Sequence, residues 1–206
     1  MRGKFITLEG IEGVGKTTAV SQVETLIGQH GYQVVRTREP GGTGSGERIR
    51  ALLLDADGAP ITPVAELLLM FAARAQHIEE VIKPALAAGH WVVCDRFTDA
   101  TYAYQGGGRG LDKSLIEQAE KIVHPDLSPD TTILLDAEPG LALKRAKARS
   151  AADRFERETL EFFQRVRTTY LALAEQYNDR YIVIDASQAL VDVQRAIESA
   201  LKPHLS

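Results

Sequence analysis

The feature that most constrains this chain is a glycine-rich turn between an apolar run and a helical pattern. Residues 8–20 read LEGIEGVGKTTAV and match the pattern G-x-x-x-x-G-K-[ST]. An apolar run at residues 5–8 precedes the pattern, and helix-spaced apolar residues follow it as far as Ile27. A strand, a glycine-rich turn and a helix are the context that this motif requires. The sequence therefore predicts a loop that binds the phosphates of a nucleoside triphosphate; the alternative is a plain glycine turn before a helix.

The residue types of this loop suit separate tasks. Its glycines let successive backbone N–H groups face an anion, and the N-terminus of the following helix adds partial positive charge. Lys16 can reach the β- and γ-phosphates, and the Thr17 hydroxyl can ligate Mg²⁺. The residues expected to contact the phosphates are Gly10, Ile11, Glu12, Gly13, Val14, Gly15, Lys16, Thr17 and Thr18.

Composition excludes several classes of function. The net charge of −4 leaves no basic surface for non-specific nucleic-acid binding. The only cysteine, Cys94, lies in an apolar run, so neither an internal disulfide nor a cysteine-based zinc site is expected. The five histidines are scattered and predict no transition-metal site. No signal peptide or membrane span is visible, which favours a cytoplasmic chain with no membrane partner.

Apolar runs that alternate with helical patterns predict the fold class. The runs cover residues 5–8, 33–37, 91–94, 132–135 and 181–184. They are continuously apolar or β-branched, as expected for parallel strands that are covered on both faces. The prediction is an α/β fold of the P-loop NTPase type: a doubly wound, five-stranded parallel sheet flanked by helices. We expect one domain over residues 1–206, with substrates at the carboxyl ends of the strands.

Two other glycine-rich stretches are predicted to be loops. GGTGSG at residues 41–46 has Ile49 in the place of the third glycine of a dinucleotide-binding motif, so a flexible loop is expected. GGGRG at residues 106–110 follows a helical segment instead of a strand. It is therefore expected to be a mobile loop and not a second phosphate site.

An acid and an arginine follow the third apolar run. Asp95 ends that run, where a carboxylate can hold Mg²⁺ through its water shell. The alternative is a carboxylate that caps the next helix. Arg96 beside it suits a second phosphate group, because a guanidinium binds phosphate through two parallel hydrogen bonds.

A basic segment occurs in this otherwise acidic chain. Residues 143–156 read LKRAKARSAADRFE, and small residues at 150–152 interrupt the charges. A solvated surface is the usual meaning of such a run. The interruption instead favours a short helical lid whose arginines close over a transferring phosphoryl group.

Together these motifs resemble those of bacterial thymidylate kinases. Besides the phosphate loop with its Glu12, the matching stretches are TREPGGT (37–43), DRF (95–97), YQGGGRG (104–110) and DRFE (153–156), in this order over nearly the whole chain. The resemblance implies transfer of the γ-phosphoryl group of ATP to dTMP in dTTP biosynthesis, giving dTDP and ADP. It also implies Mg²⁺ as cofactor and a homodimer.

The resemblance further implies a catalytic set. Members of the family carry the transition-state arginine either in the phosphate loop or in the lid, and Gly13 occupies the loop position here. The chain therefore resembles the second type, in which Arg149 and Arg154 are both candidates. The implied catalytic residues are Lys16, Asp95, Arg96, Arg149 and Arg154, with Thr17 and Asp95 nearest the metal.

Two helix faces predict the acceptor pocket. Phe71 and Arg74 are three residues apart on one helix, and Thr101, Tyr104 and Gln105 share a face of another. From spacing alone, a core aromatic and an ordinary amphipathic surface are the default interpretations.

The resemblance implies a role in dTMP binding for each of these residues. It implies that Phe71 stacks on thymine and that Arg74 and Gln105 contact its polar edge. Tyr104 would crowd the 2′ position of the sugar, and Glu12 would contact its 3′-hydroxyl side. The acceptor phosphate would bind Arg96 and Arg38, and Thr101 completes the pocket. Two alternatives stay open: a kinase for another nucleoside monophosphate, and a non-catalytic ATP-binding switch protein.

Overall fold

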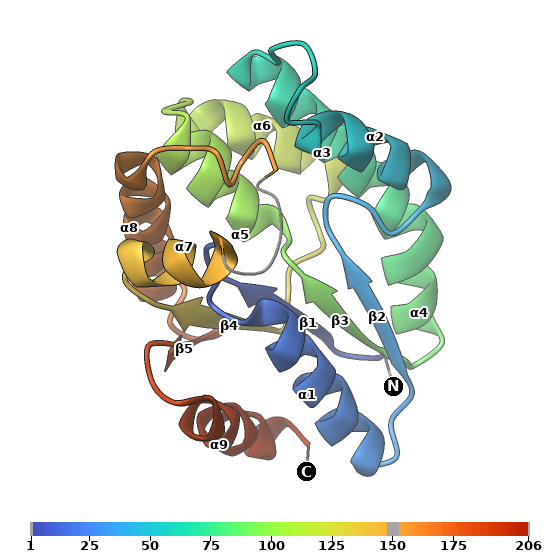
Figure 1. Ribbon diagram of the computed structural model, residues 1–206. Helices are drawn as coiled ribbons and strands as arrows, with labels where there is room; N and C mark the ends of the chain where they lie inside the picture. The colour runs from blue at the N-terminus through green and yellow to red at the C-terminus, as the bar shows by residue number, and fades with distance from the viewer. Residues whose placement is uncertain (1, 148–152, 206) are drawn as a thin grey trace.

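Five parallel strands form the single sheet around which the chain is organised (Figure 1). The computed structural model describes residues 2–147 and 153–205. The strands are β1 (Phe5–Glu9), β2 (Val34–Arg38), β3 (Trp91–Asp95), β4 (Thr131–Asp136) and β5 (Tyr181–Asp185), in the order β2-β3-β1-β4-β5. All five predicted runs are strands, with ends within one residue of those expected. The predicted five-stranded parallel α/β fold is confirmed.

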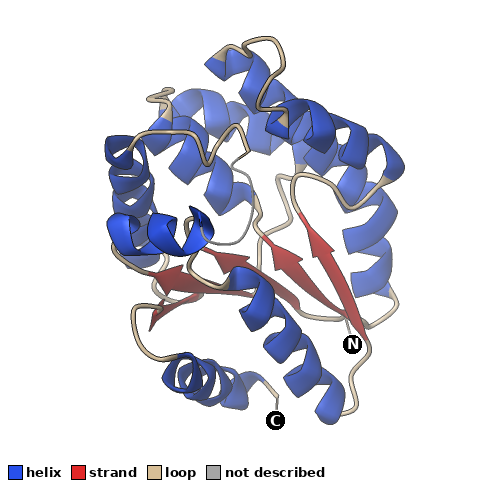
Figure 2. Cartoon of the chain, in the orientation of Figure 1, coloured by secondary structure: helices blue, strands red, loops and turns tan. Residues whose placement is uncertain are grey.

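Helices cover both faces of the sheet, as Figure 2 shows. Helices α1 and α9 pack on one face, and α4 and α8 pack on the other. The helices are α1 (Lys16–Gln29), α2 (Gly44–Leu54), α3 (Pro63–His77), α4 (Lys83–Ala87), α5 (Thr98–Thr101), α6 (Lys113–Val123), α7 (Pro139–Lys147), α8 (Leu160–Gln176) and α9 (Leu190–Leu201). Shorter segments are π-helical at Ile78–Ile82 and Tyr102–Gly108 and 3₁₀-helical at Lys202–His204. Within the described ranges, no helix is both long and apolar enough to cross a membrane.

Burial on both faces explains why the strands read as continuous apolar runs. Every residue of β1 is buried, although its side chains alternate in direction. Ile6 and Leu8 belong to the apolar cluster that contains Val20 of α1. Phe5 and Cys94 belong to the cluster on the opposite face, where Cys94 is a buried free thiol. A strand that packs on two helical layers has no polar face to alternate with.

The strand ends bring distant parts of the sequence to one edge of the sheet. In the parallel register, Asp95 of β3 lies opposite both Leu8 of β1 and Arg38 of β2. The phosphate loop follows β1 directly and leads into α1 at Lys16. The acid, the arginines and the glycine-rich loop therefore meet where ligands bind in open α/β sheets.

The prediction of a mobile loop at residues 106–110 is wrong for residues 106–108. Gly106, Gly107 and Gly108 belong to the π-helical segment that packs against α8. A Cβ on Gly107 would lie 2.1 Å from the Thr169 hydroxyl, and one on Gly108 would lie 2.5 Å from the Phe162 ring. These glycines allow a close approach of two helices, so they serve packing and not mobility.

The predicted loop at residues 41–46 is also partly wrong. Helix α2 begins at Gly44, and the Thr43 hydroxyl accepts a hydrogen bond of 3.0 Å from the Gly46 N–H. A threonine that caps a helix in this way satisfies a backbone donor with no other partner in the helix. Only the first residues of the stretch form a connection between β2 and α2.

Candidate active site

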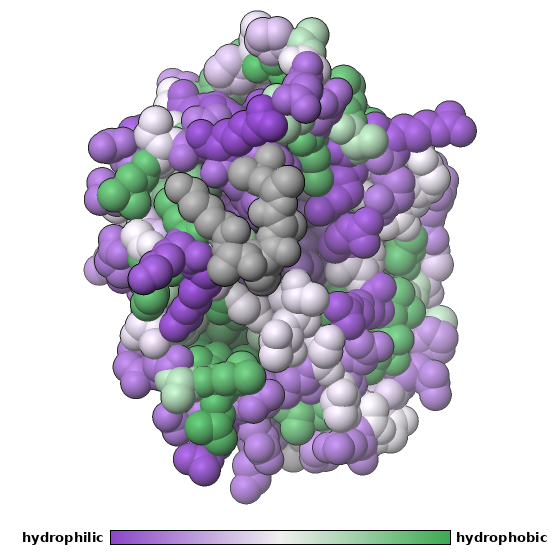
Figure 3. Space-filling model, in the orientation of Figure 1, coloured by the Kyte–Doolittle hydropathy of each residue, from purple (hydrophilic) through white to green (hydrophobic). Residues whose placement is uncertain are grey.

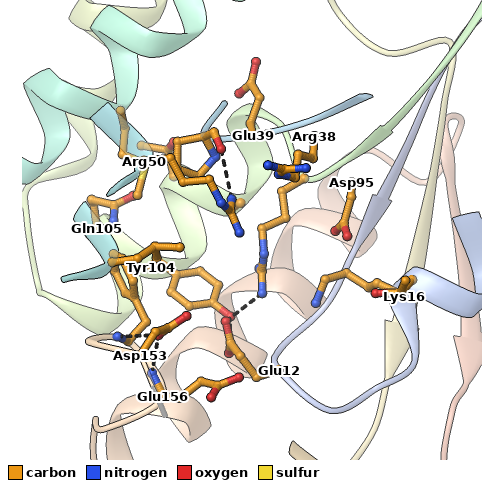
Figure 4. A pocket seen from close by; sticks show the side chains of 18 of the residues that line it. Glu12, Lys16, Arg38, Glu39, Arg50, Asp95, Tyr104, Gln105, Asp153 and Glu156 are labelled. Carbon is orange, nitrogen blue, oxygen red and sulfur yellow. Dashed lines mark hydrogen bonds and ion pairs between the residues drawn. The ribbon is translucent and has the colours of Figure 1, made fainter. Parts of the chain in front are cut away.

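A pocket of about 210 Å³ lies beside the phosphate loop at the carboxyl edge of the sheet (Figure 4). The predicted site residues that line it are Glu12, Gly13, Gly15, Lys16, Thr17, Arg38, Arg74, Asp95, Arg96, Thr101, Tyr104 and Gln105. Lys16 and Asp95 lie toward one end, and Gln105 lies toward the other. The face of the molecule drawn in Figure 3 is mostly hydrophilic, with smaller hydrophobic areas between the polar side chains. The structure therefore joins the predicted phosphate and base residues in one cavity.

The phosphate loop is packed tightly against α7. Ile11 and Val14 turn their side chains into the apolar core, which leaves the backbone of the loop at the pocket. Gly13 has a φ of +81°, and a Cβ on it would lie 1.8 Å from the carbonyl oxygen of Ala142. A side chain at this position would have to displace α7. The geometry thus fits a site whose phosphate loop carries no arginine.

The Lys16 side chain is held by hydrogen bonds to the backbone of the phosphate loop. Its ammonium group donates to the carbonyl oxygens of Gly10 at 2.9 Å and Ile11 at 2.8 Å. Burial, followed by the positive charge of Arg96, lowers the pKa of Lys16 to about 8, although Asp95 and neighbouring carboxylates oppose the shift. An anionic ligand at this position would favour the charged form of the lysine.

Arg96 has an unusual backbone conformation. Its φ is +72°, and no other non-glycine residue in the described part of the chain has a positive φ. Such a conformation costs on the order of 1–3 kcal/mol and persists only where neighbours enforce it. The Arg96 N–H donates to the Leu8 carbonyl at 3.0 Å, and the next N–H, that of Phe97, donates to Glu9 at 2.7 Å. These bonds turn the Arg96 side chain into the pocket.

Glu12 and Tyr104 hold the guanidinium of Arg96. Arg96 Nη2 donates to Glu12 Oε1 at 2.7 Å, and the Tyr104 hydroxyl donates to Glu12 Oε2 at 2.6 Å. The guanidinium also lies 4.7 Å above the centre of the Tyr104 ring. A charged group fixed from two directions is preorganised for a phosphate ligand.

The residues near the phosphate end fit Mg²⁺. Asp95 Oδ1 is buried and has no hydrogen-bond partner, and Thr17 is exposed at the start of α1. Among the described residues, no three histidine, cysteine, aspartate or glutamate side chains group into a metal site. Mg²⁺ prefers one or two protein oxygens together with water and phosphate oxygens, so a free carboxylate oxygen and a threonine hydroxyl that line the same pocket are a suitable donor set.

Arg74 presents a spare donor at the opposite end. Its side chain is 2% exposed. Nε donates to Glu39 at 2.7 Å, and Nη2 donates to the Thr101 hydroxyl at 2.9 Å and the Phe97 carbonyl at 3.2 Å. Nη1 is buried without a partner. Because an unsatisfied buried donor is costly, this nitrogen is suited to an acceptor atom of a ligand.

Phe71 does not line the pocket as expected. It packs with Leu67 and Ile116, and the Arg74 guanidinium lies 4.8 Å above its ring. The α3 residue beside Arg74 in the pocket lining is Met70. Successive helical residues differ by about 100°, so Met70 and Arg74, four apart, share the face more closely than Phe71 does. Met70, and not Phe71, is therefore the apolar side chain of this helix that faces the pocket.

Of the two arginines predicted for the lid, Arg149 and Arg154, the structure describes only Arg154. Arg154 donates to the Leu53 carbonyl at 2.7 Å and to Glu66 at 2.7 Å, and it does not line the pocket. Arg149 lies outside the described residues. The residues of this segment that line the pocket are instead Asp153, Phe155 and Glu156.

Arg38 and Arg50 add positive charge to the pocket wall. Arg38 pairs with Glu47 at 2.8 Å and is half exposed. Arg50, which sequence reasoning missed, donates to the Pro40 carbonyl at 2.9 Å. Burial, followed by the charge of Arg38, lowers the pKa of Arg50. In the sequence, the only indication that Arg50 belongs to the site is its helical spacing from Glu47.

Glu9 is another residue that the sequence did not reveal. It is fully buried and also accepts a hydrogen bond of 2.8 Å from the Tyr170 hydroxyl. Burial, followed by the negative charge of Asp99, raises its pKa from 4.5 to about 8, although Arg96 opposes the shift. The carboxyl group therefore binds a proton more readily in the folded chain than in the unfolded chain.

Glu9 should give stability a measurable pH dependence. Since its folded pKa is raised, its contribution is complete below pH 4.5 and is lost as pH rises through about 8. Relative to Glu9→Gln, the unmodified chain should lose up to about 1.4 kcal/mol of unfolding free energy per pH unit in this window. Urea unfolding at pH 5.5, 6.5 and 7.5 measures both slopes. Equal slopes would show that Glu9 does not titrate in this range.

A second pocket, of about 200 Å³, lies on the other side of the phosphate loop. It shares Gly13 and Gly15 with the first pocket. Its polar residues are Thr18, Gln22, Arg145, Gln188 and Gln194, and its apolar residues are Val14, Ala19, Ala186, Leu190, Val193 and Ile197. Two cavities therefore meet at the loop, which allows two ligands to bring their phosphate ends together.

Comparisons with known proteins agree with this arrangement. The sequence model of the family described as thymidylate kinase matches residues 8–197. The chain is 50% identical to the thymidylate kinase of Teredinibacter turnerae, with all of both chains covered. It is 55% identical to that of Chromohalobacter salexigens, over 99% of this chain and 97% of the relative. The crystal structure of the Ehrlichia chaffeensis thymidylate kinase superposes with a TM-score of 0.80, at 34% identity over all of both chains.

Proposed function

Because this chain belongs to the thymidylate kinase family, we propose how its two pockets hold the substrates of the family reaction. The chain phosphorylates dTMP to dTDP and uses ATP as the phosphoryl donor. In our proposal dTMP occupies the larger pocket, with its base toward Arg74 and Gln105 and its phosphate toward Arg96. The observation that carries this arrangement is the meeting of the two pockets at Gly13 and Gly15.

ATP occupies the phosphate loop and the smaller pocket. Its phosphates lie along residues 10–18, and its base lies among the apolar side chains near α9. Arg145, which donates to the Ala186 carbonyl at 2.7 Å, forms one wall there. A largely apolar cavity with a few polar groups is the usual environment of a nucleotide base.

The side chains of the protein act mainly by aligning the two substrates and neutralising charge on the transferring phosphoryl group. An oxygen of the dTMP phosphate attacks the γ-phosphorus in line, and the bond from that phosphorus to the bridging oxygen breaks to release ADP. Lys16 and Arg96 stabilise the charge that spreads over the transferring group. Arg38 and Arg50 hold the acceptor phosphate with Arg96. A phosphate monoester is already largely ionised near neutral pH, so no side chain is needed as a general base. Thr17 and Asp95 would hold Mg²⁺, which would neutralise further negative charge on the phosphates of ATP.

A coupled assay tests this function. ATP, Mg²⁺ and one of dTMP, dUMP, dCMP or dGMP are supplied in turn, and ADP release is measured. We expect kcat/KM to be highest for dTMP. A higher value for another monophosphate would assign a different acceptor, and ATP binding without ADP release would indicate a nucleotide-dependent switch protein.

We assign the transition-state arginine to Arg149. Arg149→Ala is expected to lower kcat by about 100-fold with little change in KM for dTMP, because the lost charge acts mainly in the transition state. Arg154→Ala is expected to lower thermal stability and raise KM instead, since it leaves the buried Glu66 with one guanidinium fewer. Steady-state kinetics and thermal unfolding separate the two variants. A selective loss of kcat in Arg154→Ala alone would reverse the assignment.

We also propose a homodimer in the cytoplasm. Large apolar side chains are exposed on the neighbouring helices α3 and α6, among them Leu68 at 59% and Ile122 at 82%. In this proposal a second copy of the chain covers them, in keeping with the homodimer that the resemblance implies. Analytical ultracentrifugation of the unmodified chain tests this, because a monomer at micromolar concentration would contradict it.

A further inference from the structure

We propose that Glu66 acts beside Arg74 in the selection of the monophosphate base, by fixing the orientation of the Gln105 amide. Glu66 lies in the first turn of α3 and is 0% exposed. Gln105 lies on the π-helical segment, is 1% exposed and lines the acceptor pocket. The inference rests on the proposed function, in which Gln105 faces the base.

Three side chains donate hydrogen bonds to the Glu66 carboxylate. Gln105 Nε2 donates to Oε1 at 2.8 Å, Arg109 Nε donates to Oε1 at 3.2 Å, and Arg154 Nη2 donates to Oε2 at 2.7 Å. Two guanidinium groups therefore compensate the buried charge, and the amide donates a third hydrogen bond. Glu66 is a positioning residue, because it acts on the substrate only through Gln105.

The carboxylate allows Gln105 only one orientation. A carboxylate accepts hydrogen bonds and cannot donate them, so the amide must place its NH₂ group toward Glu66. Its carbonyl oxygen is then the atom left for a ligand. Turning the amide over would set two acceptors 2.8 Å apart in a buried site and would remove a charge-assisted hydrogen bond.

This orientation distinguishes thymine from cytosine. Thymine carries a hydrogen on N3, which can donate to the Gln105 carbonyl oxygen. Cytosine has an unprotonated N3, which would face that oxygen as a second acceptor. A reversed amide would have the opposite preference, because its NH₂ group would match the cytosine N3. The identity of residue 66 therefore affects the choice of base through the orientation of the Gln105 amide, which lies between residue 66 and the base.

Glu66→Gln tests the inference. The new side chain has nearly the same shape, but its own amide can offer either a donor or an acceptor, so Gln105 is free to turn. We expect the ratio of kcat/KM for dTMP to that for dCMP to fall by about tenfold or more. Loss of stability alone would lower both values together and leave the ratio unchanged.

Arg109→Gln is the matched control. It removes one guanidinium from the same carboxylate but leaves Glu66 facing Gln105, so the dTMP-to-dCMP ratio should remain that of the unmodified chain. Thermal unfolding of both variants establishes that they are folded. An unchanged ratio in folded Glu66→Gln overturns the inference alone, whereas absence of dTMP turnover in the unmodified chain overturns the proposed function as well.

A second measurement needs no variant. Neutron diffraction from deuterated crystals of the unmodified chain with dTMP locates the amide deuterium atoms of Gln105. We expect both on the atom that faces Glu66. Deuterium atoms on the atom that faces the base would overturn the inference, even if Glu66→Gln did not fold.

Discussion

Lys16→Ala is expected to lower kcat by about 10²–10³-fold in a protein that remains folded. In the proposed arrangement Lys16 supplies a preorganised positive charge to the transferring phosphoryl group, and removal of one such group typically has an effect of this size. Its burial already lowers its pKa to about 8, so the folded chain tolerates the charge at some cost and should survive its loss. Single-turnover kinetics and a thermal melt measure the two effects.

Lys202→Ala provides the control for this variant. Lys202 is exposed just after the end of α9 and lines neither pocket, so its removal should leave kcat unchanged. Near-normal turnover in folded Lys16→Ala would mean that the glycine-rich loop does not bind the transferring phosphate. The catalytic part of the proposal would then be wrong.

The second large effect concerns the base. The unmodified chain is expected to use dCMP at least about 10³-fold less efficiently than dTMP, because the cytosine amino group would face the donors of Arg74. Replacing dTMP by dUMP removes only a methyl group, so the penalty should be roughly 10–200-fold. Equal kcat/KM for dTMP and dCMP would refute the pocket.

Arg74→Ala should narrow the gap between dTMP and dCMP. The variant loses the attraction for the thymine O4 and also the repulsion of the cytosine amino group. It leaves Glu39 buried without its guanidinium partner, so a lower melting temperature is expected as well. Arg74→Lys, which keeps a positively charged donor, should retain most of the discrimination. If Arg74→Ala kept the full dTMP-to-dCMP ratio, selectivity would depend on other residues.

The strands and the phosphate loop were predictable because local sequence determines them. Five apolar runs are strands because each is buried by helices on both faces, and that burial leaves a visible pattern. The loop was predictable because phosphate binding needs a specific spacing of glycines and a lysine. Asp95 and Arg96 were predictable from their place at the end of a strand.

The helical faces were harder to assign because their patterns are ambiguous. In the apolar stretch around Met70 and Phe71, several faces are equally apolar, so spacing did not show which one meets the pocket. Only the packing of Phe71 against Ile116 settles its direction. The three consecutive glycines at residues 106–108 predict a break in secondary structure, but the segment is helical because it packs against α8.

The buried acids could not be predicted at all. Glu66 and Glu39 look like ordinary surface residues in the sequence, because their partners come from remote segments. Glu66 meets Arg154, which is 88 residues away, and Glu39 meets Arg74, which is 35 residues away. Burial of a charge depends on such partners, and tertiary structure alone creates them.

The π-helical segment has a consequence for engineering of this chain. Glycine-rich stretches are the usual sites for inserted tags, deletions and circular permutation, because exposed loops absorb a change in length. Residues 106–108 have that composition but pack tightly against α8, and they follow Tyr104 and Gln105 directly in the same segment. A length change there would rotate Tyr104 and Gln105 relative to the other residues that line the pocket. The most permissive-looking stretch of the sequence is therefore one of the least suitable places to alter its length.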